Sequence, residues 1–134
     1  MSFSIFVVNY WAVLVSGLVY FIIGALWYGL LSQAWMKGIG KSREELTQRP
    51  RDYILSLIAE LLVAFVLAVT LNVFGVTGVT EALFVGALLW FGFALLPEIV
   101  HYAYEEKPLA LLAINKGYDF LGVMLAAIIL ALWR

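Results

Sequence analysis

The 134-residue sequence contains no cysteine, one histidine, three prolines and few charged residues. Without cysteine there is no disulfide framework, no CxxC metal or redox motif and no CxxCH haem attachment, and one histidine excludes a bis-histidine haem within one chain. The 8 Lys and Arg face 9 Asp and Glu, so no basic surplus indicates nucleic acid as a partner. The composition therefore provides no motif for a cofactor or a metal centre.

Charged residues make up 13% of the chain, about half the usual share of a soluble domain, whereas 65% of the residues are hydrophobic. Four apolar segments, each near the roughly 20 residues that cross a bilayer, occupy most of the length. We therefore expect an all-α fold, an integral membrane bundle of four transmembrane helices in one domain over residues 1–134. The expected spans are about 5–31, 53–74, 81–104 and 109–133.

The N-terminal apolar run does not have the pattern of a signal peptide. It lacks a basic n-region and extends from Phe3 to Leu31, which is too long for the apolar core of such a peptide. We expect it to be retained as the first transmembrane helix.

The distribution of basic residues predicts how the bundle sits in the cell membrane. Five of the eight lie in the first loop, at Lys37, Lys41, Arg43, Arg49 and Arg51, and the second loop has none. Because cytoplasmic loops carry an excess of Lys and Arg, we expect the first and third loops in the cytoplasm and both termini outside.

The first loop also carries local structural signals. Trp35 and Met36 beside Lys37 predict a short amphipathic segment on the membrane surface. Ser42 and Glu45 have the spacing of a capping box, which predicts a short helix that ends at Pro50.

Polar side chains interrupt the apolar spans at helical spacing. Glu60 falls on one face with Ala64 and Ala68, and Asn115 and Asp119 fall on another with Gly122 and Ala126. Ionisable groups are costly in hydrocarbon, and small residues allow close helix packing, so these faces should point into the bundle. The six polar residues that we expect to line a shared ligand- or proton-binding site in the cytoplasmic half are Glu60, Glu98, His101, Asn115, Lys116 and Asp119.

The third span contains Pro97, which removes a backbone donor and should kink the helix. Glu98 and His101 follow on one face at i, i+3, and we expect them to form a titrating pair beside this kink. The aromatic rings of Trp27, Tyr28 and Tyr118 combine an apolar body with a polar tip, so we expect them to narrow the pocket.

The buried acids outnumber the buried bases. Glu60, Glu98 and Asp119 face Lys116 alone, so at least one carboxyl should be protonated or bound to a cation at neutral pH. Two carboxyls that share a proton in a structural hydrogen bond are the alternative.

Several short stretches together resemble a family of small four-span bacterial membrane proteins catalogued as domain of unknown function 1761. They are Asn9 with Trp11, residues 24–28 (GALWY), 34–37 (AWMK), Gly86 with 90–93 (WFGF), Pro97, 107–108 (KP), and 114–115 (IN) with 117–118 (GY). The resemblance implies the four-helix membrane fold, and it supplies no activity, substrate or catalytic residue.

Three functions remain open. A binding or translocation protein for a small polar or ionic species is favoured, and its small-residue faces suit a homodimer. A membrane enzyme that acts on a lipid-like substrate would use Glu98, His101 and Asp119 as acid–base groups, but there is no nucleophile motif or phosphate-binding loop. A metal site of Glu98, His101, Asn115 and Asp119 lacks characteristic spacing. In a structural subunit, the polar residues would only join helices.

Overall fold

A computed structural model describes residues 3–134 of the chain, and in this range it is helical without any strand. Four helical segments are long and apolar enough to cross a membrane, Tyr10–Leu30, Pro50–Val73, Val79–Tyr104 and Leu109–Leu132. The predicted all-α bundle of a multi-pass membrane protein is therefore confirmed. The elements are η1 (Phe3–Phe6), α1 (Tyr10–Leu30), α2 (Ser32–Ile39), η2 (Arg43–Glu45), α3 (Pro50–Val73), α4 (Val79–Leu89), η3 (Trp90–Leu95), α5 (Leu96–Tyr104) and α6 (Leu109–Leu132).

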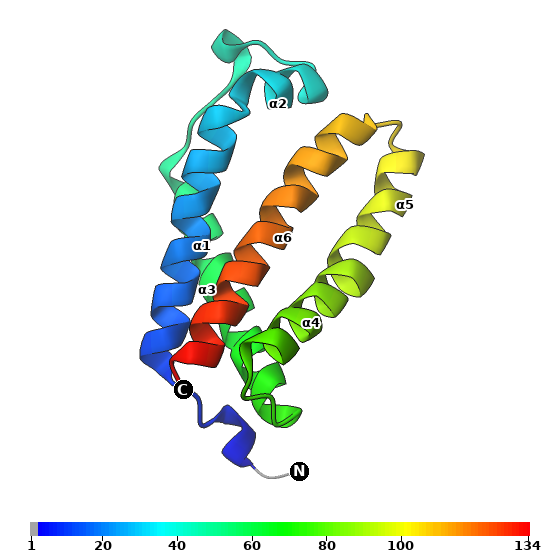
Figure 1. Ribbon diagram of the computed structural model, residues 1–134. Coiled ribbons are helices and arrows are strands. Elements are labelled where there is room, and N and C mark those ends of the chain that lie inside the picture. The colour runs from blue at the N-terminus through cyan, green and yellow to red at the C-terminus, as the bar shows by residue number, and fades with distance from the viewer. Residues whose placement is uncertain (1–2) are drawn as a thin grey trace.

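Helix α6 lies at the middle of the bundle, between α1 and the third span, and α1 packs against both α6 and α3 (Figure 1). The third span consists of α4, η3 and α5. It contacts the rest of the bundle mainly where α4 packs against α6. Both described ends of the chain lie at one end of the bundle, opposite α2 (Figure 1). We call these two ends of the molecule the termini end and the first-loop end.

The first span begins later than the sequence pattern predicts. Residues Phe3–Phe6 form a 3₁₀ turn, and α1 starts at Tyr10 because Asn9 caps it. The Asn9 side-chain oxygen accepts hydrogen bonds from the backbone N–H groups of Trp11 and Ala12, at 3.1 and 3.3 Å. Asparagine is among the best capping residues, since its oxygen satisfies donors that the first helical turn leaves free.

The first loop differs from its prediction in the role of Pro50. This proline opens α3 at its first turn, where its missing N–H costs nothing, instead of ending a preceding helix. The segment before it is only a three-residue 3₁₀ turn, and the Ser42 hydroxyl donates to the Glu45 carboxylate at 3.0 Å without a side-chain bond to the backbone. The helix of this loop is α2, which ends at Ile39 and is capped by Gly40 in the left-handed conformation (φ 73°). Its position on the membrane surface stays a prediction.

The third span changes its helical geometry just before Pro97. Residues Trp90–Leu95 form a π-helical turn, after which α5 begins at Leu96. A π turn holds one extra residue per turn, so it shifts the face that all later residues present. The kink predicted at Pro97 stays a prediction, while the π turn is a feature that the sequence pattern did not indicate.

Two apolar clusters of different size occupy the ends of the bundle. The larger cluster is buried at the termini end and consists mostly of alanine and leucine: Ala12, Val13, Ala64, Leu67, Ala68, Leu71, Ala82, Ala126, Ala127, Leu130 and Ala131. The smaller cluster, at the first-loop end, contains Tyr102, Leu111 and Leu112, with Trp35 and Ile39 of α2 packed against it. The termini end is therefore closed by apolar packing, and the first-loop end is covered by α2.

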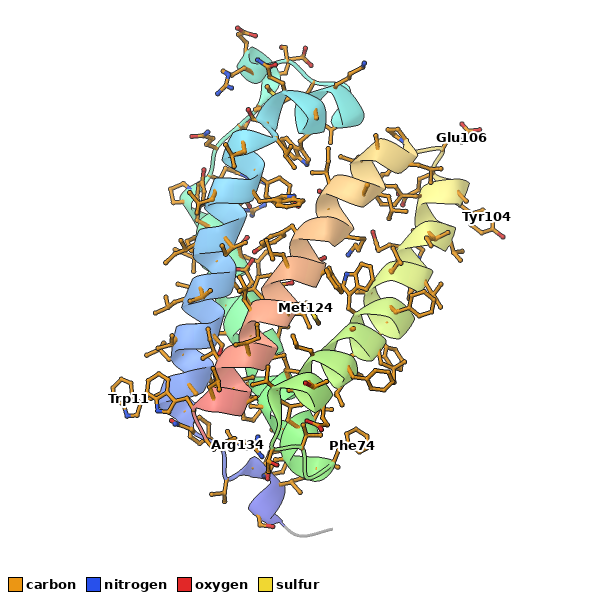
Figure 2. All side chains as sticks on the ribbon, in the orientation of Figure 1. Trp11, Phe74, Tyr104, Glu106, Met124 and Arg134 are labelled. Carbon is orange, nitrogen blue, oxygen red and sulfur yellow. The ribbon has the colours of Figure 1, made fainter. Side chains whose placement is uncertain are left out.

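Large aromatic side chains project outward near both ends of the bundle (Figure 2). Trp11 and Phe74 lie near the termini end and Tyr104 near the first-loop end, and they are 69%, 68% and 86% exposed. Aromatic rings at two levels are typical of the two interfaces of a bilayer.

Candidate functional site

Five side chains from three helices meet midway along the bundle, and we call them the central cluster: Tyr20 of α1, Glu60 of α3, and Lys116, Tyr118 and Asp119 of α6. Tyr20, Glu60 and Asp119 each lie ten residues after the first residue of their helix, roughly 15 Å along its axis. Sequence analysis expected four of these residues in a shared site, and the structure brings those four together with Tyr20.

The hydroxyl of Tyr118 is hydrogen bonded to two oxygen atoms. It is hydrogen bonded to the Glu60 carboxyl and, at 3.0 Å, to the backbone carbonyl of Tyr20. A tyrosine hydroxyl has one proton to donate, and a carbonyl oxygen can only accept. If Tyr118 donates to Tyr20, the bond to Glu60 requires a proton from the carboxyl group. Both contacts of the Tyr118 hydroxyl are hydrogen bonds when Glu60 is a neutral acid.

The second carboxyl oxygen of Glu60 is buried and has no hydrogen-bond partner within residues 3–134. The whole residue is only 9% exposed. An ionised carboxylate with an unpaired oxygen in hydrocarbon would be costly, which again favours the neutral form.

Asp119 has a different environment from Glu60. One of its oxygens accepts from the Tyr20 hydroxyl at 2.8 Å, and the other accepts from the Lys116 ammonium at 2.9 Å. Lys116 therefore neutralises Asp119 as an ion pair. Glu60 remains as the acid in the cluster without a basic partner.

Two glycines make room for the tyrosines of the cluster. A Cβ atom at Gly122 would lie 2.7 Å from three ring atoms of Tyr20, and one at Gly24 would lie 2.7 Å from the Tyr118 hydroxyl. Each helix thus presents a tyrosine to a glycine of the other, and the two rings meet edge to face at 5.2 Å. This reciprocal contact fixes α1 against α6.

A chain of polar groups runs from the cluster toward the first-loop end. The Tyr28 hydroxyl donates to the Asn115 side-chain oxygen, and the Asn115 amide donates to the Tyr102 hydroxyl, both at 2.8 Å. The Tyr28 ring also meets the Tyr118 ring edge to face at 5.4 Å. We call Tyr28, Asn115 and Tyr102 the polar chain.

The polar chain ends at the third loop. The Lys107 ammonium lies 5.2 Å from the centre of the Tyr102 ring and 2.7 Å from the Glu105 carboxylate. The hydrogen bond from Lys107 holds the pKa of Glu105 below its ordinary value. The polar chain therefore connects the interior with a charged, exposed loop.

Two tryptophans donate to backbone carbonyls of α6. The Trp27 indole N–H bonds to the Ile114 carbonyl at 2.8 Å, and the Trp90 indole N–H bonds to the Lys116 carbonyl at 3.0 Å. The Trp27 bond thus joins α1 to α6, and the Trp90 bond joins the third span to α6. Sequence reasoning did not select Trp90, Tyr20 or Tyr102 as site residues, although the i, i+4 spacing of Tyr20 and Gly24 places both on one face.

Glu98 and His101 lie apart from the central cluster. They are separated from each other by 3.4 Å on α5, with His101 63% exposed at its side chain. No hydrogen bond joins either residue to the cluster in the described range. Within residues 3–134, no three acidic or histidine side chains are grouped closely enough to hold a metal ion.

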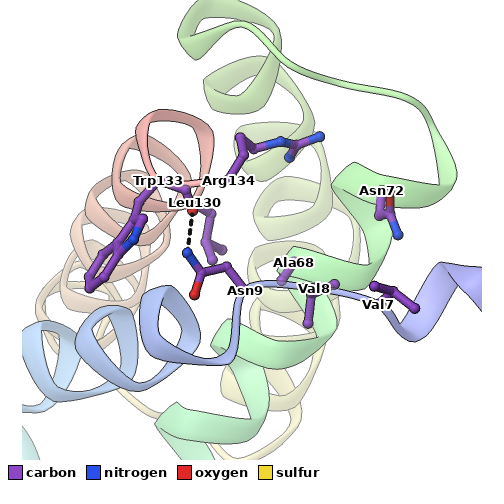
Figure 3. A pocket seen from close by; sticks show the side chains of 8 residues that line it. All are labelled: Val7, Val8, Asn9, Ala68, Asn72, Leu130, Trp133 and Arg134. Atoms are coloured by element: carbon purple, nitrogen blue, oxygen red, sulfur yellow. Dashed lines mark hydrogen bonds between the residues drawn. The ribbon is translucent and has the colours of Figure 1, made fainter.

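A small cavity of about 120 Å³ lies at the termini end, between the start of α1 and the ends of α3 and α6 (Figure 3). Asn9 reaches across it and donates to the Trp133 carbonyl at 3.4 Å. Asn72 donates to the Ile5 carbonyl at 3.0 Å. These amides join segments distant in sequence, so we interpret this cavity as part of the structural closure of the bundle.

Comparison with known protein families shows to which family the chain belongs. Residues 11–131 match the family described as "Protein of unknown function (DUF1761)". The chain belongs to this family. The match covers all four membrane-spanning segments of this DUF1761 protein and confirms the resemblance seen in its sequence. No curated protein and no solved structure gives a significant match.

Proposed function

We propose that this membrane protein binds a small polar or ionic species together with an exchangeable proton, and that Glu60 carries the proton. The observation that supports this most directly is that the Tyr118 hydroxyl has one proton but makes two hydrogen bonds, to Glu60 and to the Tyr20 carbonyl. A neutral Glu60 satisfies both contacts. An acid that is neutral in one state and ionised in another can couple a proton to the binding of a cation.

The two ends of the bundle differ in a way that supports access from one side. The polar chain leads from the centre to the first-loop end, whereas the larger apolar cluster, mostly alanine and leucine, is buried at the termini end. The proposed site therefore binds from the first-loop side, which the basic residues of the first loop predict to be cytoplasmic.

The residues of the proposed site have distinct roles. Glu60 holds the proton, and Tyr118 receives it in a hydrogen bond. The Lys116–Asp119 pair keeps the rest of the cluster electrically neutral, so the charge of the site depends on Glu60. Tyr28 and Asn115 offer hydroxyl and amide groups along the entry route.

Proton uptake by the purified protein in detergent tests the proposal. On acidification from about pH 9 to about pH 6, imidazole and α-amino groups take up protons, whereas an ordinary carboxyl remains ionised. The difference in uptake between the wild type and a variant without the Glu60 carboxyl therefore reports a carboxyl in an unusual environment. We expect the wild type to take up one proton more than the Glu60→Gln variant. A Glu98→Gln variant serves as the matched control and should behave as wild type.

A structural role is the second candidate, because the bonds of the cluster also join α1, α3 and α6. It predicts equal proton uptake by wild type and Glu60→Gln, with a lower melting temperature for the variant. Equal uptake would therefore remove the proton-binding proposal.

A further inference from the structure

A groove of about 340 Å³ lies between α6 and the third span, and it shares only Lys116 with the central cluster. Its walls include Trp90 and Leu95 of η3, and Leu112, Ala113 and Phe120 of α6, with Lys116 as its charged residue. The volume falls at the lower end of the range of small-molecule sites. Because the third span is packed mainly through α4, the groove lies where the two helices are less closely joined.

Lys116 gives this groove a polar recognition element. Its ammonium has three donors, and the described residues supply one acceptor, the Asp119 carboxylate at 2.9 Å. Lys116 lines the groove, and Asp119 is not among its lining residues. Lys116 is therefore the member of the ion pair that lines the groove, and its ammonium has donors beyond the one bonded to Asp119.

The opposite wall is built by the π-helical turn. Trp90 is the first residue of that turn and donates its indole N–H to the Lys116 backbone carbonyl, which holds the wall against the backbone of α6. The Trp90 and Phe120 rings meet edge to face at 4.8 Å. Single π turns are often found at functional sites.

We propose that the groove binds a long-chain carboxylic acid, with the carboxylate on Lys116 and the apolar chain against Trp90, Leu95 and Leu112. The depth of Lys116 favours this ligand over a phospholipid. It lies seven residues after Leu109, roughly 10 Å inside the helix end, whereas a phospholipid phosphate stays at headgroup level. A single-chain acid is able to bring its small head to that depth from the surrounding bilayer.

Quenching of Trp90 fluorescence tests this proposal with the purified full-length protein. The probe is a long-chain fatty acid with bromine at mid-chain, and its methyl ester is the control ligand. We expect saturable quenching by the acid that is lost in Trp90→Phe. The ester should bind at least about tenfold more weakly, since it loses the charge-assisted hydrogen bonds.

Two further variants separate binding from folding. Ala113→Phe fills the groove without changing the ion pair and should weaken quenching at least about tenfold, whereas Ala110→Phe, on the same helix but outside the groove, should not. The double variant Lys116→Met/Asp119→Asn removes both charges together, so no unpaired charge is left, and should also bind weakly.

Three outcomes of the quenching measurements would overturn the proposal, and so would one outcome of a displacement experiment. They are equal quenching by acid and ester, quenching unaffected by Ala113→Phe, and quenching that persists in Trp90→Phe. Displacement of the brominated acid by phospholipid but not by unbrominated acid would also overturn it, because the groove would then hold ordinary membrane lipid.

Discussion

At the scale of single residues, the centre of this protein depends on two tyrosines that replace water as partners of buried acids. Tyr118 contacts Glu60, and Tyr20 contacts Asp119. Both rings occupy positions that a glycine on the facing helix leaves open. The hydrogen bonds and the close helix packing are therefore one structural feature, and a change in either should disturb both.

Gly122→Ala tests this dependence. The new methyl group would lie 2.7 Å from ring atoms of Tyr20, and overpacking of this kind costs about 1–3 kcal/mol. We expect a lower melting temperature in detergent. Gly29→Ala is the control, because a Cβ there meets nothing within 4 Å and alanine favours a helix by up to about 1 kcal/mol. Equal melting temperatures for the two variants would contradict the role of the glycine.

The sequence predicts part of the central cluster and of the residues around it for a clear reason. An acid, lysine or amide inside an apolar span must face protein, so Glu60, Asn115, Lys116 and Asp119 were identifiable from their cost in lipid. Tyr20 and Trp90 were not, because a tyrosine or tryptophan in a span is equally compatible with the interface and the interior. Which of these aromatic groups donates inward depends on the three-dimensional packing.

At the scale of elements, the π-helical turn Trp90–Leu95 explains why Glu98 and His101 lie away from the cluster. Their shared face follows correctly from i, i+3 spacing, and they do contact each other. That this face points into the bundle was predicted from the cost of ionisable groups in hydrocarbon. The extra residue of the π turn rotates α5 relative to α4, and no local sequence signal fixed this rotation.

Deletion of Gly92 tests the function of the π turn. The shorter segment should become regular α-helix and rotate α5 by about 100°, the angle of one residue. Tyr102 of α5 is 4% exposed and bonded to Asn115 of α6, and the rotation would remove it from this contact. The loss should lower the free energy of unfolding by about 2 kcal/mol or more. We expect a clear fall in melting temperature.

Gly92→Ala provides the matched control for this deletion. It keeps the residue count, and its Cβ enters open space. If the deletion and the substitution melt at the same temperature as the wild type, the π turn does not position Tyr102.

At the scale of the whole molecule, the hydrogen bonds of the polar chain lie between the middle of the bundle and its first-loop end, and the larger apolar cluster lies at its termini end. The four spans and the all-helical class follow from length and hydropathy alone, which is why the sequence predicts them well. The orientation in the membrane rests on the basic first loop and stays a prediction.

Because the native chain has no cysteine, single-cysteine variants report the orientation without background. We expect Ser42→Cys in the first loop to resist a membrane-impermeant thiol reagent in intact cells and to react after permeabilisation. Thr77→Cys in the second loop should react in intact cells. The reverse pattern would place the polar chain toward the outside and contradict cytoplasmic access.

The central claim is that Glu60 is a neutral acid in the resting protein, and infrared spectroscopy measures this directly. At neutral pH we predict a carbonyl stretch of a protonated carboxylic acid that is present in the wild type, retained in Glu98→Gln and absent in Glu60→Gln. A wild-type spectrum without this band, or a band unchanged in Glu60→Gln, would show that Glu60 does not carry the proton and would contradict the account.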